Sequence, residues 1–388
     1  MRLFVVCVYR KKDITMSVYY FAMIILSVMG YIFNARGRQA KNTAFYLVMA
    51  FCALVFIVSF RYGIGFDYFS YERIYEMVSA WSFRDILRYY WYEPFYFLIC
   101  KIFSLAGCSY PVFLLGINIF LIAAAMWFIY RYSKLPWVSV YLYIALQFLA
   151  YNMNLVRQSI AVVFFLFAYP SLKNRKIVLY TVWIFIGGLF HNSLWFVWPL
   201  FFLLRIKITK KLFVGFAVMV ALVYFFFEPL FAFLSPFLPL KYVHYQAGYF
   251  WIPSTFGYLV PYALYCLIVY LFRDRIADPK QRCMYLDSAL YSAAISLFIT
   301  RHFILERFAV YPFALSLIAL PEIIVSYEND RKWSGRSVPG YYRVLILILV
   351  FGGVYFSFSA AKGVHSVYPY VSLMQKGYSA PDEMFDGG

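Results

Sequence analysis

The fold is decided at a junction between an apolar run and a polar, aromatic segment. The run Thr43–Phe60 reads TAFYLVMAFCALVFIVSF, and Arg61–Tyr71, RYGIGFDYFSY, follows it without a break. The run has the length and composition of a helix that crosses a bilayer. The segment after it holds an arginine, a carboxylate, two glycines and three tyrosines, although a few Lys or Arg are enough to anchor such a helix. We therefore expect this segment to hold a polar, ring-bearing ligand at the membrane surface.

Composition places the rest of the chain in the membrane as well. Of its 388 residues, 64% are hydrophobic and 13% are charged, against roughly 25% charged residues in soluble domains. Apolar runs of about 17–25 residues recur along the whole length, so we predict one all-α, polytopic integral membrane domain over residues 1–388. The net charge of +18 does not indicate a nucleic-acid partner, because the Lys and Arg residues stand in short loops between spans. The six cysteines show no zinc-ligand spacing.

The apolar runs predict about twelve transmembrane helices, some of them so short that they need tilting or local bilayer thinning. No fixed-period repeat and no inverted duplication is visible in the sequence. The expected spans are Met16–Asn34, Thr43–Phe60, Val112–Tyr130, Trp137–Asn152, Leu155–Leu172, Ile177–Phe190, Asn192–Leu204, Leu212–Phe227, Thr255–Phe272, Met284–Ile299, Ile304–Ser326 and Val344–Phe358.

The basic residues assign a side of the membrane to each loop. One set of alternate loops carries about twenty Lys and Arg and the other about eleven, which makes the richer side cytoplasmic by the positive-inside rule. Both ends of the chain then face outward, including a tail over residues 361–388. Residues 1–15 precede Met16–Tyr20, where we expect the true start. The richer loops are Arg36–Lys41, Arg131–Lys134, Lys173–Lys176, Arg205–Lys211, Arg273–Arg282 and Arg331–Arg343.

The first outer loop is predicted to cover residues 61–110. Within it, Ser70–Tyr92 mixes charged residues with apolar and aromatic ones, which is typical of an amphipathic helix lying on the membrane surface. Glu93–Ala106, at about 14 residues, is short for a crossing. Only two crossings fit between the cytoplasmic loops Arg36–Lys41 and Arg131–Lys134, so we expect Glu93–Ala106 to be re-entrant or interfacial.

The outward loops collect arginines, histidines and carboxylates. Several have an ordinary structural alternative: Asp67 as a helix cap, Glu93 as a helix-dipole carboxylate, Arg157 as an interfacial anchor and His191 as a packed histidine. Polar residues at membrane depth are nevertheless functional by default. The collected set comprises Arg61, Asp67, Glu72, Glu93, Asn152, Asn154, Arg157, Gln158, His191, Lys241, His244, Tyr245, Arg301, His302, Glu306 and Arg307.

This set of side chains suits one kind of chemistry. Two or more arginines at the outer surface can bind a pyrophosphate through planar, bidentate hydrogen bonds, and tyrosines pack against sugar faces. A carboxylate or a histidine can remove the proton of an attacking hydroxyl. Together they predict a transferase that acts on a lipid-linked pyrophosphoryl saccharide. No His, Cys and Asp cluster has metal-ligand spacing, so we expect no metal or other cofactor, and the arginines would neutralise the leaving pyrophosphate.

Five motifs follow one another in order along the chain. They are Phe60-Arg61-x-Gly63-x-Gly65-x-Asp67-Tyr68-x-x-Tyr71, Glu93-Pro94-Phe95-Tyr96, Val156-Arg157-Gln158-Ser159-Ile160-Ala161, Leu172-Lys173-Asn174-Arg175-Lys176 and Phe190-His191-Asn192-Ser193. Their order and spacing resemble the EpsG-type family, the Wzy-like polymerases of bacterial exopolysaccharide and capsule. The resemblance covers Tyr19–Leu204, and the C-terminal half matches mainly in an arginine at Glu306-Arg307-Phe308.

The resemblance implies a glycosyltransferase-C-like membrane fold. It also implies polymerisation of undecaprenyl-pyrophosphate-linked repeat units of capsule, exopolysaccharide or O-antigen on the outer face of the bacterial cytoplasmic membrane, with a chain-length regulator as a further partner. The growing glycan moves from its lipid carrier to a hydroxyl of the next unit. On these grounds Arg61, Arg157, Arg301 and Arg307 are assigned to pyrophosphate, Asp67 or His191 to the general base, Glu93 to orienting the acceptor or supporting an arginine, and Tyr68, Tyr71, Asn154 and Gln158 to the substrate.

Three other functions stay open. A flippase of the same lipid-linked unit would have a similar span count, but it would carry charges at mid-membrane depth, where this chain has almost none. A membrane acyltransferase that decorates the glycan would also use a histidine and an arginine. A structural subunit would use the outer loops to bind a partner. Analysis of the accumulated products separates these functions.

Overall fold

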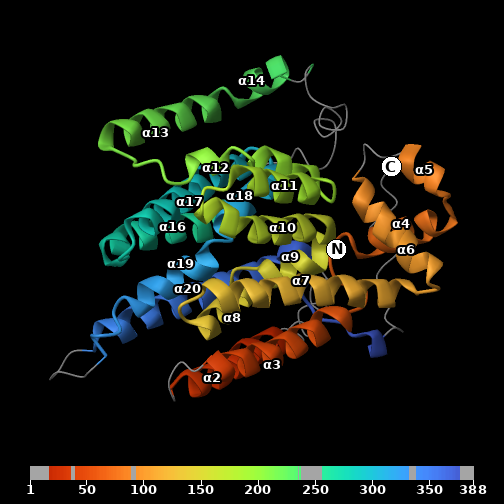
Figure 1. The fold of residues 1–388 in the computed structure, drawn as a ribbon, viewed down its shortest axis with the longest axis horizontal. Helices are drawn as coiled ribbons and strands as arrows, with labels where there is room; N and C mark the ends of the chain where they lie inside the picture. The colour runs from red at the N-terminus through yellow and green to blue at the C-terminus, as the bar shows by residue number, and fades with distance from the viewer. Residues whose placement is uncertain are drawn as a thin grey trace, which may run out of the picture. The chain divides into compact units, whose positions relative to one another are not determined.

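The computed structural model describes residues 17–35, 40–88, 93–234, 236, 256–331 and 338–375, and its ribbon is built from helices (Figure 1). Within these ranges no β-ladder forms, and a single isolated bridge pairs Arg61 with Ser372. The all-α class predicted from the sequence is confirmed. Lys241, His244 and Tyr245 lie outside the described residues, as does the expected start at Met16.

A multi-pass membrane protein is also confirmed. In the described part of the chain, five helices are long and apolar enough to cross a membrane, and two bent helix pairs raise the number to seven if each pair is one span. The predicted count of about twelve is not reached by this measure, because several apolar runs form helices too short to cross. The run Trp137–Asn152, for example, is divided into α8 (Pro136–Ala145) and α9 (Phe148–Asn154) at Gln147, whose φ is 70°.

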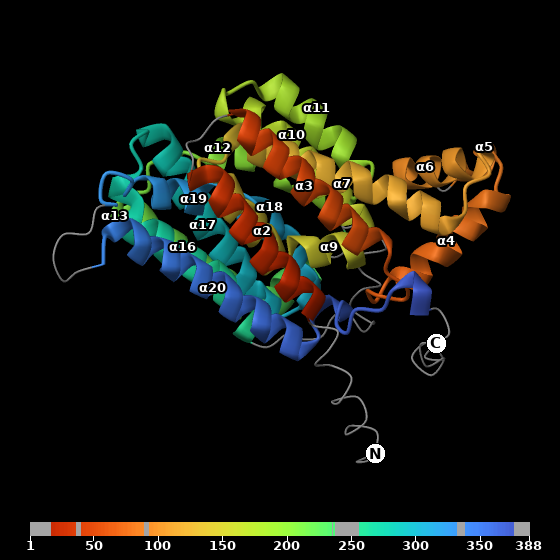
Figure 2. The same ribbon diagram turned by 90° about the horizontal axis from the view of Figure 1, so that it is seen from below.

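The described chain forms two compact units. The first takes in the described residues up to Phe167, then Phe185–Asn192, and those from Leu345 onward. Its elements are α2 (Ser17–Ala35), α3 (Ala40–Ser59), α4 (Tyr68–Ala80), α5 (Phe83–Arg88), α6 (Pro94–Leu105), α7 (Tyr110–Tyr132), α8, α9, most of α10 (Val156–Lys173), most of α20 (Gly340–Lys362) and η10 (Val364–Ser366). In this unit α3 packs on α7 (Figure 2). Helix α2 packs on α3 and α8.

Three short helices, α4, α5 and α6, gather at the Tyr110 end of α7 (Figures 1 and 2). The predicted helix over Ser70–Tyr92 is in fact divided between α4 and α5, because the chain is capped anew at Ser82. The main-chain N–H of Ser82 donates to Asp85 Oδ2 over 2.8 Å, and that of Asp85 donates back to Ser82 Oγ over 3.3 Å. This reciprocal pair is a capping box, which starts α5 in a new direction.

Helix α6 is the segment predicted to be re-entrant or interfacial. Its 12 residues extend over about 18 Å, less than the hydrocarbon core of about 30 Å. It packs on α4, and Lys101 Nζ donates to the main-chain oxygen of Ser79 over 2.8 Å. The short length fits the expectation, while the position of α6 relative to the membrane stays a prediction.

The second unit takes in Ala168–Ile184 and Ser193–Val344. In it α17 packs against α16 and α18, and α16 packs against α19. Helix α13 turns into α14 through a bend of 76°, and α18 turns into α19 through a bend of 44°. The elements are most of α11 (Ile177–Gly188), η2 (Asn192–Val197), α12 (Leu200–Leu203), α13 (Lys210–Phe225), α14 (Phe227–Leu234), α16 (Val260–Phe272), α17 (Pro279–Leu297), η8 (Phe298–Thr300), α18 (Glu306–Phe313) and α19 (Ser316–Val325).

Candidate active site

The first unit buries a carboxylate among hydrogen-bond donors. Glu93 stands at the start of α6 with a φ of 73°, a left-handed conformation that is uncommon for a residue other than glycine. Its Oε2 accepts a hydrogen bond from Arg157 Nη1 over 2.7 Å. Its Oε1 accepts from the main-chain N–H of Asn192 over 3.4 Å and lies 3.5 Å from His191 Nδ1. One carboxylate thus connects α6, the start of α10 and the turn after α11, and strained backbone of this kind is typical of functional sites.

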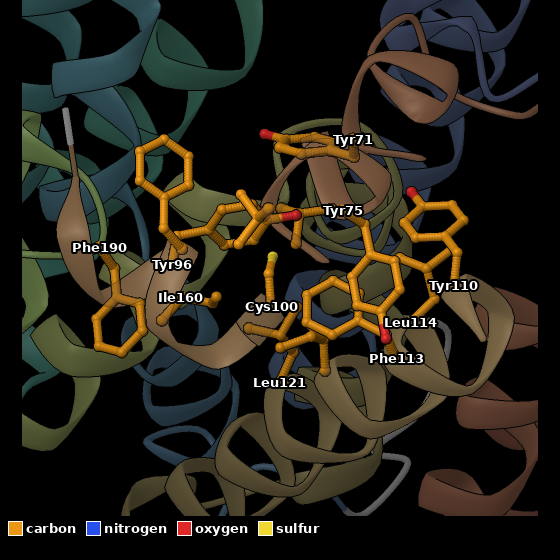
Figure 3. Close-up of a cluster of buried hydrophobic side chains, with 14 of the residues drawn as sticks. Tyr71, Tyr75, Tyr96, Cys100, Tyr110, Phe113, Leu114, Leu121, Ile160 and Phe190 are labelled. Carbon is orange, nitrogen blue, oxygen red and sulfur yellow. The ribbon is translucent and has the colours of Figure 1, made fainter. Parts of the chain in front are cut away.

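Arg157 rests on aromatic rings. Its guanidinium carbon lies 5.6 Å from the ring centroid of Tyr71 and 5.9 Å from that of Tyr96, within reach of a cation–π interaction. Figure 3 shows both tyrosines in a cluster of buried side chains that also contains Tyr75 and Tyr110. The Arg157 side chain remains 25% exposed, whereas that of its partner carboxylate is 8% exposed. The arginine is therefore fixed in place while part of it stays accessible.

Arg61 has a different environment. It is 1% exposed, its Nη1 donates to the main-chain oxygen of Val58, and its Nη2 donates to that of Met153 over 3.0 Å. A guanidinium that is closed off from solvent and bonded to main-chain carbonyls has little left for a pyrophosphate. The geometry favours a structural role in which Arg61 ties the end of α3 to α9, while the expected contact with a pyrophosphate stays a prediction.

The four residues expected to contact the substrate are buried. Tyr68 lies beneath Arg61, with its ring centroid 5.9 Å from the guanidinium carbon, and Tyr71 lies beneath the other arginine. Asn154 Oδ1 accepts a hydrogen bond from the main-chain N–H of Asp67 over 3.2 Å, and Gln158 is buried on α10. Their geometry favours packing and positioning over contact with a sugar. Asp67, the second candidate for the general base, is half-buried at the start of α4.

The chain after α20 closes onto the junction that decides the fold. The main-chain N–H of Tyr62 donates to the oxygen of Val371 over 2.9 Å, and that of Gly65 donates to the oxygen of Ser366 over 3.0 Å. His365 Nδ1 lies 3.3 Å from Asn154 Nδ2. The first part of the predicted outer tail is therefore packed against the motif, where it supports Asn154 and, through it, the start of α4.

Gly65 is required by both its backbone and its surroundings. Its φ is +100°, and a Cβ there would lie 2.7 Å from the main-chain oxygen of Met153, whereas Gly107 has a φ of +71° with nothing near its would-be Cβ. Left-handed backbone costs an alanine about 1–2 kcal/mol, and overpacking adds about 1–3 kcal/mol. We expect Gly65→Ala to lower the unfolding temperature of the purified protein well below that of Gly107→Ala, which pays only the first cost. Equal unfolding temperatures would show that Gly65 does not pack as described.

His365 should make stability depend on pH. Burial lowers the pKa of His365 to about 4, against about 6.5 in the unfolded chain. Between these values the unfolded state binds a proton that the folded state does not, so the free energy of unfolding should fall as the pH drops from about 6.5 towards 4. Thermal unfolding across this range measures it. His365→Asn, whose side chain does not titrate and tolerates left-handed backbone, should lose that part of the slope; an unchanged slope would contradict the assignment.

Glu72 on α4 and Asn152 on α9 belong to the first unit, whereas the polar candidates Arg301–Arg307 belong to the second. The guanidinium carbon of Arg301 lies 4.5 Å from the ring centroid of Tyr224, and the neighbouring His302 is paired through Nε2 with Glu228 Oε1 at 2.6 Å. Arg307 is half-buried in the first turn of α18. Arg301 and Arg307 therefore lie in the second unit, whereas Glu93, Arg157 and His191 lie in the first.

Sequence reasoning missed two residues. His365 pairs with a side chain 211 positions away, and its only signal was a lone histidine in an aromatic segment after an apolar span. Asp287, buried on α17, accepts a hydrogen bond from the main-chain N–H of Arg205, and it was hidden inside a predicted span. In the described ranges no group of three or more His, Cys, Asp or Glu residues is placed to hold a metal ion.

The fold and the site define a multi-pass helical membrane protein in which a buried glutamate pairs with a half-buried arginine beside a histidine. The chain belongs to the EpsG family, whose sequence model matches residues 44–372. The matched range includes Glu93, Arg157 and His191, which we call the Glu93 cluster. The family indicates a polysaccharide polymerase-like function. Neither a comparison with curated proteins nor one with solved structures gives a match.

Proposed function

We propose that this protein polymerises undecaprenyl-pyrophosphate-linked oligosaccharide units on the outer face of the bacterial cytoplasmic membrane, without a metal ion. Membership of the EpsG family supports the polymerase class. The observation that carries the proposal furthest is the contact of 2.7 Å between Glu93 and Arg157. It is the arrangement expected if Glu93 supports an arginine that binds the pyrophosphate.

Arg157 is the proposed pyrophosphate ligand. A guanidinium has five N–H donors, and the bond to Glu93 is made by Nη1 alone. We assign the phosphate oxygens to the accessible part of the guanidinium, since 25% of the side chain is exposed. The carboxylate and the two tyrosine rings hold the charge in one place before the substrate arrives, which is how preorganised donors stabilise a developing anion. Arg301 and Arg307 remain further candidates for phosphate contacts.

His191 is the proposed general base. Its Nδ1 lies 3.5 Å from Glu93 Oε1, so the carboxylate orients the imidazole ring. A base oriented by a third group in this way is the usual arrangement around an activated nucleophile. Asp67, which is half-buried at the start of α4, stays the alternative.

In the proposed step a hydroxyl oxygen of the acceptor unit attacks the anomeric carbon of the donor glycan. The bond between that carbon and the pyrophosphate oxygen breaks, and its electron pair leaves with the pyrophosphate, whose charge Arg157 binds. The hydroxyl proton passes to the imidazole of His191. The products are a lipid-linked glycan longer by the transferred chain and free undecaprenyl pyrophosphate.

The products that accumulate in cells lacking the protein test this function. Loss of a polymerase should leave single lipid-linked units on the outer side of the cytoplasmic membrane, accessible to enzymes added to intact spheroplasts. Single units that accumulate on the inner side would instead indicate a flippase. Full-length chains that lack only an ester would indicate an acyltransferase. Either of these two results would overturn the proposal.

A further inference from the structure

The second unit contains an apolar cavity that no step of the proposed reaction uses. It has a volume of about 530 Å³ and lies between α13 and the elements η2, α12, α17 and α18. Tyr291 is the one hydroxyl-bearing residue in its lining, and that hydroxyl donates to the main-chain oxygen of Leu203 over 3.2 Å. The lining thus offers no unsatisfied polar side chain to hold water, and such cavities take apolar ligands.

The shape of the cavity follows α13. No residue of this helix is fully buried; Phe216, Val220 and Val223 are half-buried and line the cavity at helical spacing. The lining runs from Leu212 to Val223, which corresponds to about 16 Å along the helix axis, or roughly half of the hydrocarbon core. A slot of this length beside a single helix suits one extended hydrocarbon chain.

One end of the slot carries a positive charge. Tyr224 directly follows Val223, its ring lies 5.9 Å from that of Phe298, another lining residue, and its hydroxyl is 3.0 Å from Thr300 Oγ1. Arg301 lies over this tyrosine ring at 4.5 Å. Across the described residues Arg301 takes part in no ion pair, and its Nε has no hydrogen-bond partner.

The carboxylate that pairs with the neighbouring His302 forms no ion pair with Arg301 among the described residues. Glu228 follows the bend after α13, and its Oε1 is taken up by His302 Nε2 at 2.6 Å. The guanidinium of Arg301 is therefore left to complement an anion at the end of an apolar slot. An anionic lipid with one chain meets both conditions.

We propose that this cavity binds the isoprenoid chain of a polyprenyl phosphate and that Arg301 binds its phosphate. The choice of an isoprenoid rests on the proposed function, whereas the single-chain slot and its charged end rest on the second unit alone. A diacyl phospholipid fits less well, because its two chains would have to share a slot formed along one helix.

Binding of undecaprenyl phosphate, which carries no sugar, tests the proposal apart from catalysis. Native mass spectrometry of the purified protein would compare wild type with Val220→Trp, which fills the slot, and Val218→Trp, a matched change on the same helix at a residue outside the lining and 53% exposed. We expect Val220→Trp to weaken binding about tenfold or more, because the indole occupies the space of the chain, and Val218→Trp to leave it unchanged. Arg301→Gln should weaken binding of undecaprenyl phosphate but not of undecaprenol.

The possible results separate this proposal from the proposed function. Equal binding by the two tryptophan variants, or equal competition by phosphatidylglycerol, would overturn it and leave the cavity to ordinary lipid or to another part of the chain. That result would leave the proposed polymerase function standing. Selective binding that is lost in Val220→Trp supports the site even if no polymer is formed, and a missing polymer would then count against the proposed function alone.

Discussion

Replacing Arg157 with alanine should abolish polymer formation in cells while the protein still accumulates in the membrane. The side chain is the accessible, prepositioned cation of the Glu93 cluster, with 25% of its surface exposed. Removing one preorganised donor from a site that stabilises a developing anion typically lowers the rate by about 10²–10³-fold. Arg157→Lys retains the charge but not the planar fork, so it should produce shortened chains at a lower rate. Gel analysis of extracted polysaccharide measures both effects.

The control for this prediction is Arg84→Ala. Arg84 is an exposed arginine on α5 of the same unit, and its loss should leave chain lengths unchanged. Because Arg157→Ala leaves Glu93 without its charged partner, the amount of folded protein is measured beside activity by fluorescence-detected gel filtration. Chains of wild-type length made by folded Arg157→Ala would remove this residue from the site.

Replacing Glu93 should give the largest combined loss of stability and activity. Glu93→Ala leaves a partly buried guanidinium unpaired, which costs about 3–5 kcal/mol, and it frees both Arg157 and His191 from their common partner. Glu93→Gln keeps the size of the side chain but not its charge. We expect this variant to fold and to lose about 100-fold in rate, since small misplacements of catalytic groups cost that much. Thermal unfolding and chain-length analysis separate the two effects.

A double-mutant comparison tests whether Glu93 acts through Arg157. If it does, Glu93→Gln combined with Arg157→Lys should cost much less than the product of the two single losses. Glu76→Gln, at an exposed glutamate on α4, serves as the matched control and should leave activity unchanged. Losses that multiply independently would contradict the positioning role of Glu93.

The sequence predicted helices whose ends are set by neighbouring residues. Val112–Tyr130 was expected as a span and is found within α7, Tyr110–Tyr132, because an uninterrupted apolar run bounded by Pro and Arg leaves few alternatives. The break at Gln147 was not predicted, since nothing in the residue type requires a φ of 70°. The predicted span Trp137–Asn152 therefore appears as two helices, and among the described residues the predicted number of crossings is not confirmed by the criterion of length.

The candidate site shows the same division. The motifs around Glu93, Arg157 and His191 were found from residue type, and the structure brings these three side chains together. The burial of Arg61 was not predicted, because its acceptor, the main-chain oxygen of Met153, is 92 positions away. His365 was missed for the same reason. Sequence patterns indicate which side chains are unusual for a membrane loop, but the choice between a structural and a catalytic arginine depends on long-range contacts.

Turnover by the purified protein tests the central claim most directly. Wild type and Arg157→Ala would each be supplied with the lipid-linked repeat unit of the host's polysaccharide, in the presence of a metal chelator, and the products separated on a gel. A ladder of longer lipid-linked chains from wild type alone is the result that the account predicts. Unit that is bound but unchanged by wild type would contradict a polymerase, and a ladder from both proteins would contradict the role of Arg157.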